Sequence, residues 1–573
     1  MPSRSRSSAP PQPDAAAGRL KGRGLSALIR GLLVLGLFLL AAAPAAAQAL
    51  ARRLNFLVIV ADDLGYSDLG AFGGEIDTPN LDKLALSGVR LTGFHTAAAC
   101  APTRAMLLTG ADAHRAGLGN MPESMQKNQV GEEGYEGYLR PDTATLAERM
   151  SAAGYRTLFS GKWHLGVQPD QDPHARGFQQ SFAMLHCCHN HFGLGATDDP
   201  TKMPGYRENG VTVSHLPADF YSSRFFAAKL DEQLKSSKAG PDGNKPFFAY
   251  LAFTAPHAPL QAPPETIAKY KGRYDAGFEA LRAQRLARQR ALGLLDPAVD
   301  PHRVVDAPAW DQLTADQKQV ASRKMEIYAA MVDELDQAVG RVVQTLKDTG
   351  EYDDTVIIFL SDNGAEGRED TRMPDPPGPG PKLDAMGSAQ SYVNYGPAWA
   401  QAATAPSWRF KTFASEGGIR TPAFVAGPVV AHRGAVSGVY TNAVDVLPTI
   451  VELAGARIEP DRFAGRKVRP VDGISWTTFL KTGAPVYPAD RAVGEELFGS
   501  RALRQGDRKI TDIGDNRWRL FNITADPGET HDLSEAQPAR KAALLKAWDA
   551  YARDVHVVVP DPPLQPTPRK APE

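Results

Sequence analysis

The stretch Leu54-Asn55-Phe56-Leu57-Val58-Ile59-Val60-Ala61 is a mostly apolar run that stops at Asp62-Asp63. Its β-branched and large apolar residues are typical of a strand that is buried on both faces of a sheet. Two further runs repeat this design: residues 247–253 lead into Thr254-Ala255-Pro256-His257, and residues 355–360 lead into Ser361-Asp362-Asn363-Gly364. All three predicted strands therefore have polar side chains directly after their carboxyl ends.

Helical patterns lie between these runs. In residues 325–348, apolar residues recur three or four positions apart until Gly350, and residues 142–153 show a shorter pattern that ends before Gly154. Strands that alternate with helices predict an α/β fold with a large mixed, mostly parallel sheet flanked by helices. In such sheets, ligand sites gather at the carboxyl edge of the strands.

The polar residues after the strands form a candidate metal site. Asp62, Asp63, Asp362 and Asn363 offer carboxylate and amide oxygens, without a thiolate among them. Oxygen donors suit a hard cation, so the set favours Ca²⁺ over Zn²⁺, with Mg²⁺ as the alternative. Each pair taken alone is also typical of a turn that closes a strand. Two such pairs after two buried strands shift the balance toward a metal site.

Composition excludes several classes of protein. The chain has 573 residues, a formal net charge of −1 and three cysteines, two of them adjacent at Cys187-Cys188. Without a basic tract, nucleic acid is not an expected partner. Three cysteines cannot build a disulfide framework, so stability has to come from packing. A chain of this length exceeds a single core, which rarely grows past about 250–300 residues, and a second smaller unit is expected.

The first 49 residues are typical of a secretory signal peptide. Basic residues between Arg19 and Arg30 precede the apolar run 31–43, and small residues around Ala47 and Ala49 suit cleavage. The apolar run is too short to span a bilayer comfortably, although an uncleaved anchor is the alternative. We therefore expect a periplasmic or secreted protein that has no membrane contact after cleavage.

Residues 100–110 carry the most specific signal. Cys100-Ala101-Pro102-Thr103-Arg104 resembles the signature in which type I sulfatases convert a cysteine to formylglycine, or 3-oxoalanine. Pro102 suits the first position of a helix, which would place Cys100 near unpaired backbone N–H groups that favour an anion. Read without the family, the segment is a short buried helix after an inert cysteine.

Further segments extend the resemblance from about Asn55 to Leu533. In the order of the family, these are 62–66, 78–82, 154–166, 362–364, and Lys411 followed by 416–422. The chain resembles a bacterial arylsulfatase of the alkaline-phosphatase superfamily, a sulfuric ester hydrolase of class EC 3.1.6. The resemblance implies an alkaline-phosphatase-like fold. It also implies a catalytic domain over 50–422 and a C-terminal subdomain with a small antiparallel sheet over 423–556. The proline-rich composition of residues 557–573 predicts a disordered tail.

The resemblance also implies a role for each matched residue. Asp62, Asp63, Asp362, Asn363 and modified Cys100 would surround Ca²⁺, while Lys162 and Lys411 would hold sulfate oxygens. Arg104 would orient the formylglycine hydrate and Asp362 would help to activate its attacking hydroxyl. His257 would bind the ester and protonate the departing alcohol or phenol, and His164 would remove the proton that triggers sulfate release.

A hydrated aldehyde solves a chemical problem that an ordinary nucleophile leaves open. A serine or thiol that attacked a sulfate ester would remain as a stable sulfated residue. In the hydrate, one hydroxyl attacks sulfur, and deprotonation of the other breaks the carbon–oxygen bond and expels sulfate. The expected partners are thus a small sulfate ester and a formylglycine-generating or radical maturation enzyme.

Two other functions remain open from the sequence. One is a phosphonate or phosphodiester hydrolase of the same superfamily, which Asn363, Lys162 and His164 argue against. The other is a non-catalytic protein that binds sulfated ligands with Cys100 unoxidised. A transition-metal site at His186-Cys187-Cys188-His189-Asn190-His191 is disfavoured, because two adjacent cysteines cannot easily present both sulfurs to one tetrahedral ion and no second ligand pair follows at zinc-finger spacing. The segment is better interpreted as a loop near the pocket, and no role is assigned to His191.

Overall fold

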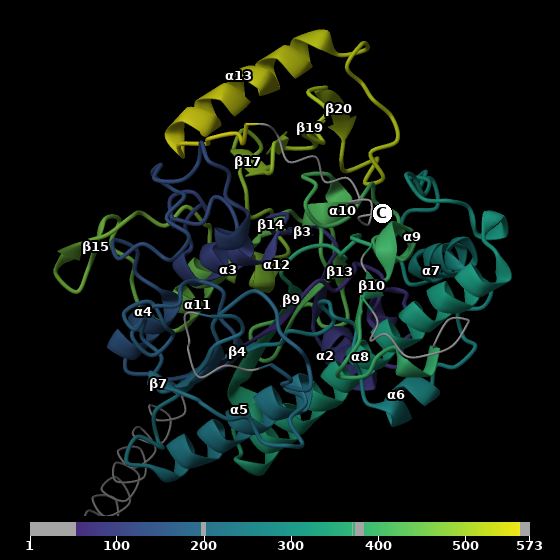
Figure 1. Cartoon of the computed structure of the whole chain (residues 1–573). Coiled ribbons are helices and arrows are strands. Elements are labelled where there is room, and N and C mark those ends of the chain that lie inside the picture. Colours follow the sequence, from purple (N-terminus) through teal and green to yellow (C-terminus); the bar gives the residue numbers. More distant parts are fainter. Residues whose placement is uncertain (1–52, 196–201, 370, 373–382, 562–573) are drawn as a thin grey trace, which may run out of the picture. The chain divides into compact units, whose positions relative to one another are not determined.

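The fold is described from a computed structural model that covers residues 53–195, 202–369, 371–372 and 383–561 (Figure 1). The predicted signal peptide, residues 1–49, lies outside the described residues. Residues from Leu54 onward belong to one compact unit. Among the described residues, no helix is both long and apolar enough to cross a membrane.

A ten-stranded sheet forms the centre of this unit. Its strand order is β13-β2-β12-β9-β1-β8-β4-β5-β6-β7. Strand β1 (Asn55–Ala61) pairs in parallel with β8 (Phe247–Ala252) and β9 (Thr355–Ser361), so that Val60 lies opposite Ala252 and Leu360. On the far side of β9, β12 (Ala423–Ala426) runs antiparallel. The predicted mixed, mostly parallel sheet flanked by helices is confirmed.

The other strands of this sheet complete its two sides. They are β2 (Val89–Leu91), β4 (Arg156–Lys162), β5 (Gln180–Met184), β6 (Tyr206–Glu208), β7 (Val211–Thr212) and β13 (Val436–Ser437). Strand β4 pairs in parallel with both β8 and β5. Short strand pairs outside it are β3 (Phe94–His95) with β14 (Thr441–Asn442), β10 (Thr371–Arg372) with β11 (Tyr392–Val393), and β15 (Arg462–Phe463) with β16 (Arg466–Lys467).

Helices cover both faces of the large sheet. In β1, Leu57 and Ile59 belong to one apolar core, and Val58 and Val60 to the other, because successive side chains point to opposite faces. The first core packs against α2 (Pro79–Ser87), α5 (Ser222–Ala239), α6 (Pro264–Ala268), α7 (Phe278–Ala291), α8 (Ala315–Asp348) and α9 (Gly396–Ala403). The second packs against α3 (Cys100–Thr109), α4 (Leu146–Ala152), α11 (Val446–Leu453) and α12 (Thr477–Thr482).

Two helices begin earlier than the sequence predicted. Helix α8 starts at Ala315 rather than 325, because Thr314 and Gln317 form a capping box that extends it over an exposed first stretch. Helix α3 starts at Cys100, which places Pro102 third rather than first in the helix. A proline is tolerated there because the first N–H groups of a helix have no intrahelical partner.

A small antiparallel sheet follows near the carboxyl end. Its strands are β17 (Ala492–Leu497), β18 (Ser500–Gln505), β19 (Arg508–Asp512) and β20 (Arg519–Asn522), and α13 (Pro538–Asp554) packs on it. Lys509 of β19 is buried. Its Nζ donates hydrogen bonds to Oε1 of Glu416 in α10 (Glu416–Ile419), at 2.8 Å, and to Oε1 of Glu529, at 3.0 Å. The domain boundary at residue 423 stays a prediction. Strands β12 and β13, which follow it, belong to the large sheet.

Candidate active site

The predicted site residues meet at the carboxyl edge of the large sheet. Asp62 and Asp63 follow β1, Asp362 and Asn363 follow β9, and Lys162 is the last residue of β4. The backbone N–H of Asp63 lies 3.3 Å from Oδ1 of Asp362, which joins the two acidic pairs directly. The parallel register of β1 and β9 therefore brings together carboxylates that are about three hundred residues apart in the chain.

Each of the two predicted sulfate-binding lysines is paired with a carboxylate. Nζ of Lys162 lies 2.8 Å from Oδ2 of Asp62. Nζ of Lys411 lies 2.7 and 2.9 Å from the two carboxylate oxygens of Asp63. All four side chains are at most 2% exposed. Two fixed ammonium groups thus lie in a site that water does not screen.

The oxygen-rich cluster fits a hard cation. Nδ2 of Asn363 donates to Oδ1 of Asp63 at 2.7 Å, which turns the amide oxygen of Asn363 the other way. Within the described part of the chain, that oxygen and Oδ1 of Asp62 are buried without a hydrogen-bond partner. Buried oxygens without donors are costly unless a cation accepts their lone pairs. These residues therefore fit the predicted Ca²⁺, whose presence stays a prediction.

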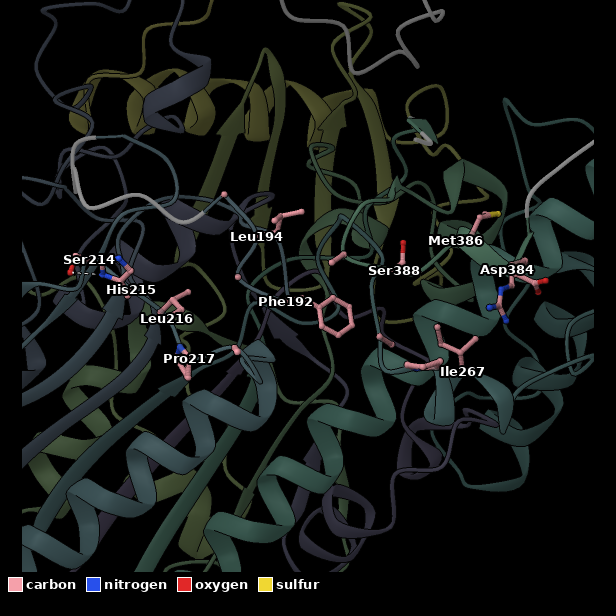
Figure 2. Close-up of a pocket in the computed structure, with 18 residues that line it drawn as sticks. Phe192, Leu194, Ser214, His215, Leu216, Pro217, Ile267, Asp384, Met386 and Ser388 are labelled. Atoms are coloured by element: carbon pink, nitrogen blue, oxygen red, sulfur yellow. Dashed lines mark hydrogen bonds between the residues drawn. The ribbon is translucent and has the colours of Figure 1, made fainter. Parts of the chain in front are cut away.

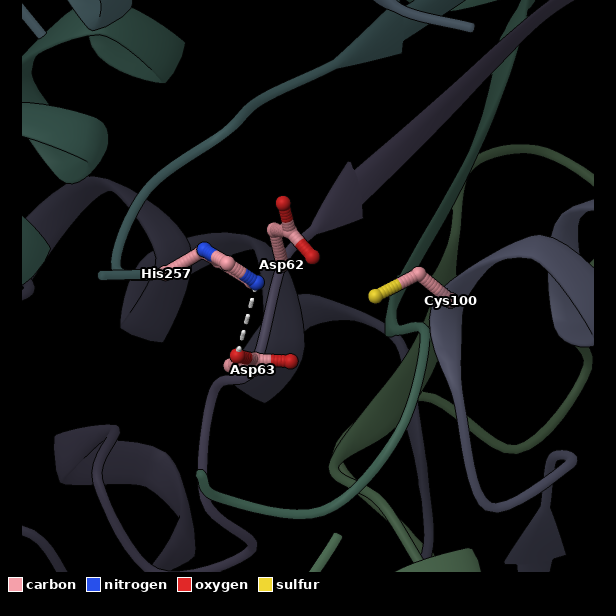
Figure 3. Close-up of side chains that lie close together, drawn as sticks. All are labelled: Asp62, Asp63, Cys100 and His257. Carbon is pink, nitrogen blue, oxygen red and sulfur yellow. Dashed lines mark ion pairs between the residues drawn. The ribbon is translucent and has the colours of Figure 1, made fainter. Parts of the chain in front are cut away.

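Cys100 faces this cluster from the first turn of α3. Ligand atoms of Asp62, Asp63, Cys100 and His257 all lie within 4.8 Å of one another (Figure 3). The cysteine is 1% exposed, and burial raises the pKa of its thiol well above its usual value, although Lys162 and Lys411 oppose that shift. An unmodified Cys100 is therefore a protonated, weakly nucleophilic thiol.

Arg104 lies one helical turn from Cys100 and contacts Asp362. It also donates through Nη1 to the backbone oxygen of Lys162 at 3.1 Å. The arginine and Asp362 are both fully buried. Its predicted role in orienting the hydrate stays a prediction, and its structural role is to hold the Asp362 carboxylate in place.

The two predicted histidines have different environments. Nε2 of His257 lies 3.6 Å from Oδ2 of Asp63, and its Nδ1 lies 2.6 Å from the backbone oxygen of Ala258. Burial, aided by Lys411, lowers the pKa of His257 to about 3. Nε2 of His164 lies 3.2 Å from Oε2 of Glu123, and burial lowers the pKa of His164 despite that carboxylate. A neutral His164 suits the removal of a proton.

Comparison with known proteins identifies the family to which the chain belongs. The sulfatase family model matches residues 54–456, which include every predicted site residue. The chain belongs to the sulfatase family. It is thus a hydrolase of sulfate esters, within the alkaline-phosphatase superfamily.

Two curated relatives of this sulfatase cover most of the chain. It is 44% identical over 537 residues to an uncharacterized sulfatase of Schizosaccharomyces pombe, covering 89% of this chain and 95% of the relative. It is 39% identical over 435 residues to an arylsulfatase of Klebsiella aerogenes, covering 74% and 91%. A crystal structure of Ps i-CgsB with k-i-k-neocarrahexaose has the same fold, with 24% identity, coverage of 88% and 93%, and a TM-score of 0.64.

This sulfatase also has a cavity of about 780 Å³ (Figure 2). Phe192, Leu216, Ile267 and Met386 give it an apolar wall. Of the described residues that line it, none belongs to the predicted catalytic or metal-binding set. The predicted site residues therefore belong to the buried cluster at the sheet edge and not to the lining of this cavity.

Sequence reasoning missed two residues around the site and assigned no role to a third. Glu123 contacts His164, and Oε2 of Glu366 lies 3.6 Å from Nζ of Lys411. His191, which was left unassigned, is buried and its Nε2 lies 3.0 Å from the backbone oxygen of His257. No motif marks Glu123, whereas Glu366 lies just after the Asp362-Asn363 pair and could have been considered for that reason.

Proposed function

We propose that this sulfatase is an arylsulfatase. It hydrolyses sulfate monoesters to a phenol or alcohol and sulfate, through formylglycine made from Cys100, and it works in the periplasm or outside the cell. The observation that carries this proposal is the position of Cys100, within 4.8 Å of the Asp62-Asp63 carboxylates. The similarity to the arylsulfatase of Klebsiella aerogenes supports the aryl specificity.

The buried charges of the site fit an ester that carries a negative sulfate group. Ca²⁺ held by Asp62, Asp63, Asp362, Asn363 and the Cys100-derived residue would supply positive charge beside the sulfate. Lys162 and Lys411 contact the sulfate oxygens and offset the charge that develops during transfer. Because these ammonium groups are buried and fixed by carboxylates, little reorganisation is needed when the transition state forms.

Proton transfer falls to two side chains on opposite parts of the site. His257 binds the ester and gives a proton to the departing phenol oxygen, while neutral His164 accepts the proton that must leave before sulfate is released. Asp362 helps to activate the attacking hydroxyl, and Arg104 holds that carboxylate. Burial and the nearby Lys411 lower the pKa of His257 in the free site, and the negative charge of a bound ester would favour its protonated form.

The proposal is tested first on the residue at position 100. Protein made in its own host is digested, and the mass of the peptide that contains Cys100 is measured. We expect the mass of formylglycine or its hydrate, together with turnover of aryl sulfates that exceeds turnover of aryl phosphonates. The Cys100→Ser variant, which lacks the thiol, should lose at least about 10³-fold in turnover. A thiol that persists despite a competent maturation system would contradict the proposal.

A further inference from the structure

A second group of metal-ligating side chains lies beside the active site. Glu123, His164 and Cys187 each offer one ligand atom, and these three atoms lie within 4.8 Å of one another. The residues come from separate segments: Glu123 from the short helix η2 (Pro122–Ser124), His164 from the turn after β4, and Cys187 from the segment after β5. The sequence shows no second ligand pair near Cys187. The fold instead brings Glu123 and His164 to Cys187 from distant parts of the chain.

Cys188 lies next to this group but is not among the residues whose ligand atoms lie within 4.8 Å of one another. Its sulfur lies 3.0 Å from the sulfur of Cys187, and both cysteines are free and half-buried. The sulfur of Cys187, an imidazole nitrogen and a carboxylate oxygen form a donor set that differs in kind from the all-oxygen set of Asp62, Asp63, Asp362 and Asn363. Thiolate and imidazole ligands select Zn²⁺ and related soft cations, whereas carboxylates alone favour Ca²⁺ or Mg²⁺.

One ring nitrogen of His164 faces Glu123. The imidazole is 3% exposed, and its Nε2 lies 3.2 Å from Oε2 of Glu123, so Nε2 is the nitrogen that can share a cation with this carboxylate. The opposite nitrogen, Nδ1, is buried without a hydrogen-bond partner in the described part of the chain and would carry the proton of the metal-bound imidazole. Glu123 is 40% exposed, so its carboxylate can rotate as the group closes.

The spacing fits tetrahedral zinc after small side-chain movements. Bonds of about 2.0–2.3 Å place neighbouring ligand atoms of a tetrahedral Zn²⁺ site about 3.3–3.8 Å apart. The ligand atoms of Glu123, His164 and Cys187, which lie within 4.8 Å of one another, therefore have to move slightly closer together, and water can fill the fourth position.

We propose that Glu123, His164 and Cys187 form a site for Zn²⁺ or a similar thiophilic divalent cation, and that its occupation inhibits the sulfatase. On binding, the Cys187 thiol releases one proton to solvent and coordinates the cation as a thiolate, without any change of oxidation state. The inhibition rests on the proposed function, because it follows from His164 being the proton acceptor for sulfate release. An imidazole that binds the cation can no longer take up that proton.

Binding is tested on the mature enzyme, reduced with a metal-free reductant and saturated with Ca²⁺ so that the oxygen site is filled. ZnCl₂ is titrated by calorimetry, and Cd²⁺ replaces it as a spectroscopic probe for thiolate-to-metal absorption. We expect one Zn²⁺ per chain and an absorption band with Cd²⁺. Cys187→Ser should weaken zinc binding at least about 10-fold and remove most of the band. Equal zinc affinity in the two proteins, or no thiolate band, would overturn the site.

Turnover gives the second readout. Zinc should inhibit aryl sulfate hydrolysis by the unmodified enzyme and should do so far less in Cys187→Ser, whose turnover without zinc should be unchanged. Glu123→Gln should also weaken zinc binding, whereas Glu535→Gln, at an exposed position, serves as the matched control and should leave it unchanged. If zinc binds in a way that depends on Cys187 but turnover is unaffected, the proposed inhibition is wrong. If zinc binds and the protein shows no turnover of sulfate esters at all, the zinc site is supported and the proposed function is contradicted.

Discussion

Nε and Nη2 of Arg104 both donate to Oδ2 of Asp362, at 2.9 and 2.7 Å, in the fully buried floor of the active site. The second arginine nitrogen also lies 3.8 Å from Oδ1 of Asp62. Two charge-assisted bonds to a single oxygen fix the carboxylate in one orientation and leave its Oδ1 facing the N–H of Asp63. The arginine therefore links the helix that carries Cys100 to the strand that carries the second acidic pair.

Arg104→Ala should damage both stability and activity. Removing one partner of a buried ion pair leaves an uncompensated charge, which typically costs about 3–5 kcal/mol. We expect that loss in the free energy of unfolding by urea, and a fall in kcat/KM of at least about 10²-fold because Asp362 loses its orientation. Arg517→Ala is the control, since Arg517 is 70% exposed and its pair with Asp532 spans 3.8 Å. Equal effects of the two substitutions would contradict the role given to Arg104.

Removing bound metal should destabilise the enzyme as well as inactivate it. The buried carboxylates of Asp62, Asp63 and Asp362 repel one another when the cation is absent. Adding Ca²⁺ at 100 times its Kd to chelator-treated protein should stabilise it by about 2.7 kcal/mol, seen as a higher Tm. Mg²⁺ should give a smaller increase, because it loses its bound water less readily.

A pair of asparagine variants makes the metal experiment specific. Asn363→Ala removes an amide oxygen that is buried without a partner in the described part of the chain, and it should shift the Ca²⁺ titration to higher concentration. Asn244→Ala, at an exposed position, should titrate as the unmodified protein does. If Ca²⁺ leaves the Tm of the unmodified protein unchanged, the assignment of these residues as metal ligands fails.

The two histidine roles predict different kinetics. With His257→Asn, kcat/KM should fall about 10²–10⁴-fold for esters of weakly acidic phenols and much less for nitrophenyl sulfate, whose phenolate leaves without a proton. With His164→Asn, the first phenol should still appear rapidly, as a burst of one per enzyme, before slow turnover. A series of aryl sulfates measured by stopped flow separates the two patterns. A burst from His257→Asn and none from His164→Asn would reverse the roles.

Much of the fold and site follows from short-range patterns in the sequence. The buried strands β1, β8 and β9 are apolar runs that end within one residue of their predicted limits, and the acidic pairs after them lie where parallel strands must place them. The start of α8 was missed because residues 315–320 are mostly exposed and carry no apolar repeat. Its signal was the capping box at Thr314 and Gln317.

Contacts between distant loops could not be predicted in the same way. Glu123 meets His164 across 41 positions, and Cys187 joins them from a third segment. No periodicity or local propensity relates these positions, because loops carry neither, and only the complete fold brings them together. The pairing of Lys162 with Asp62 likewise depends on β1 and β4 both flanking β8 in the sheet.

His114, a buried histidine outside the predicted catalytic set, should make the stability of the fold fall at alkaline pH. Nδ1 of His114 lies 3.0 Å from Asp112, and its Nε2 lies 3.7 Å from Glu496. Burial alone would lower the pKa of His114, but the two carboxylates raise it to about 10. A raised folded-state pKa contributes stability that is fully present below the unfolded value of about 6.5 and is lost as the pH rises through about 10.

Urea unfolding at a series of pH values from 7 to 10 measures this contribution. His114→Asn should lower the free energy of unfolding at pH 7, and the difference from the unmodified protein should shrink by about 3 kcal/mol by pH 10. His432→Asn changes an exposed position, so the difference between its free energy of unfolding and that of the unmodified protein should stay constant over the whole pH range. A difference between the unmodified protein and His114→Asn that stays constant with pH would show that His114 acts by packing alone. A difference that narrows toward pH 10 means that the charge of His114 stabilises the fold through its pairing with Asp112 and with Glu496 of β17.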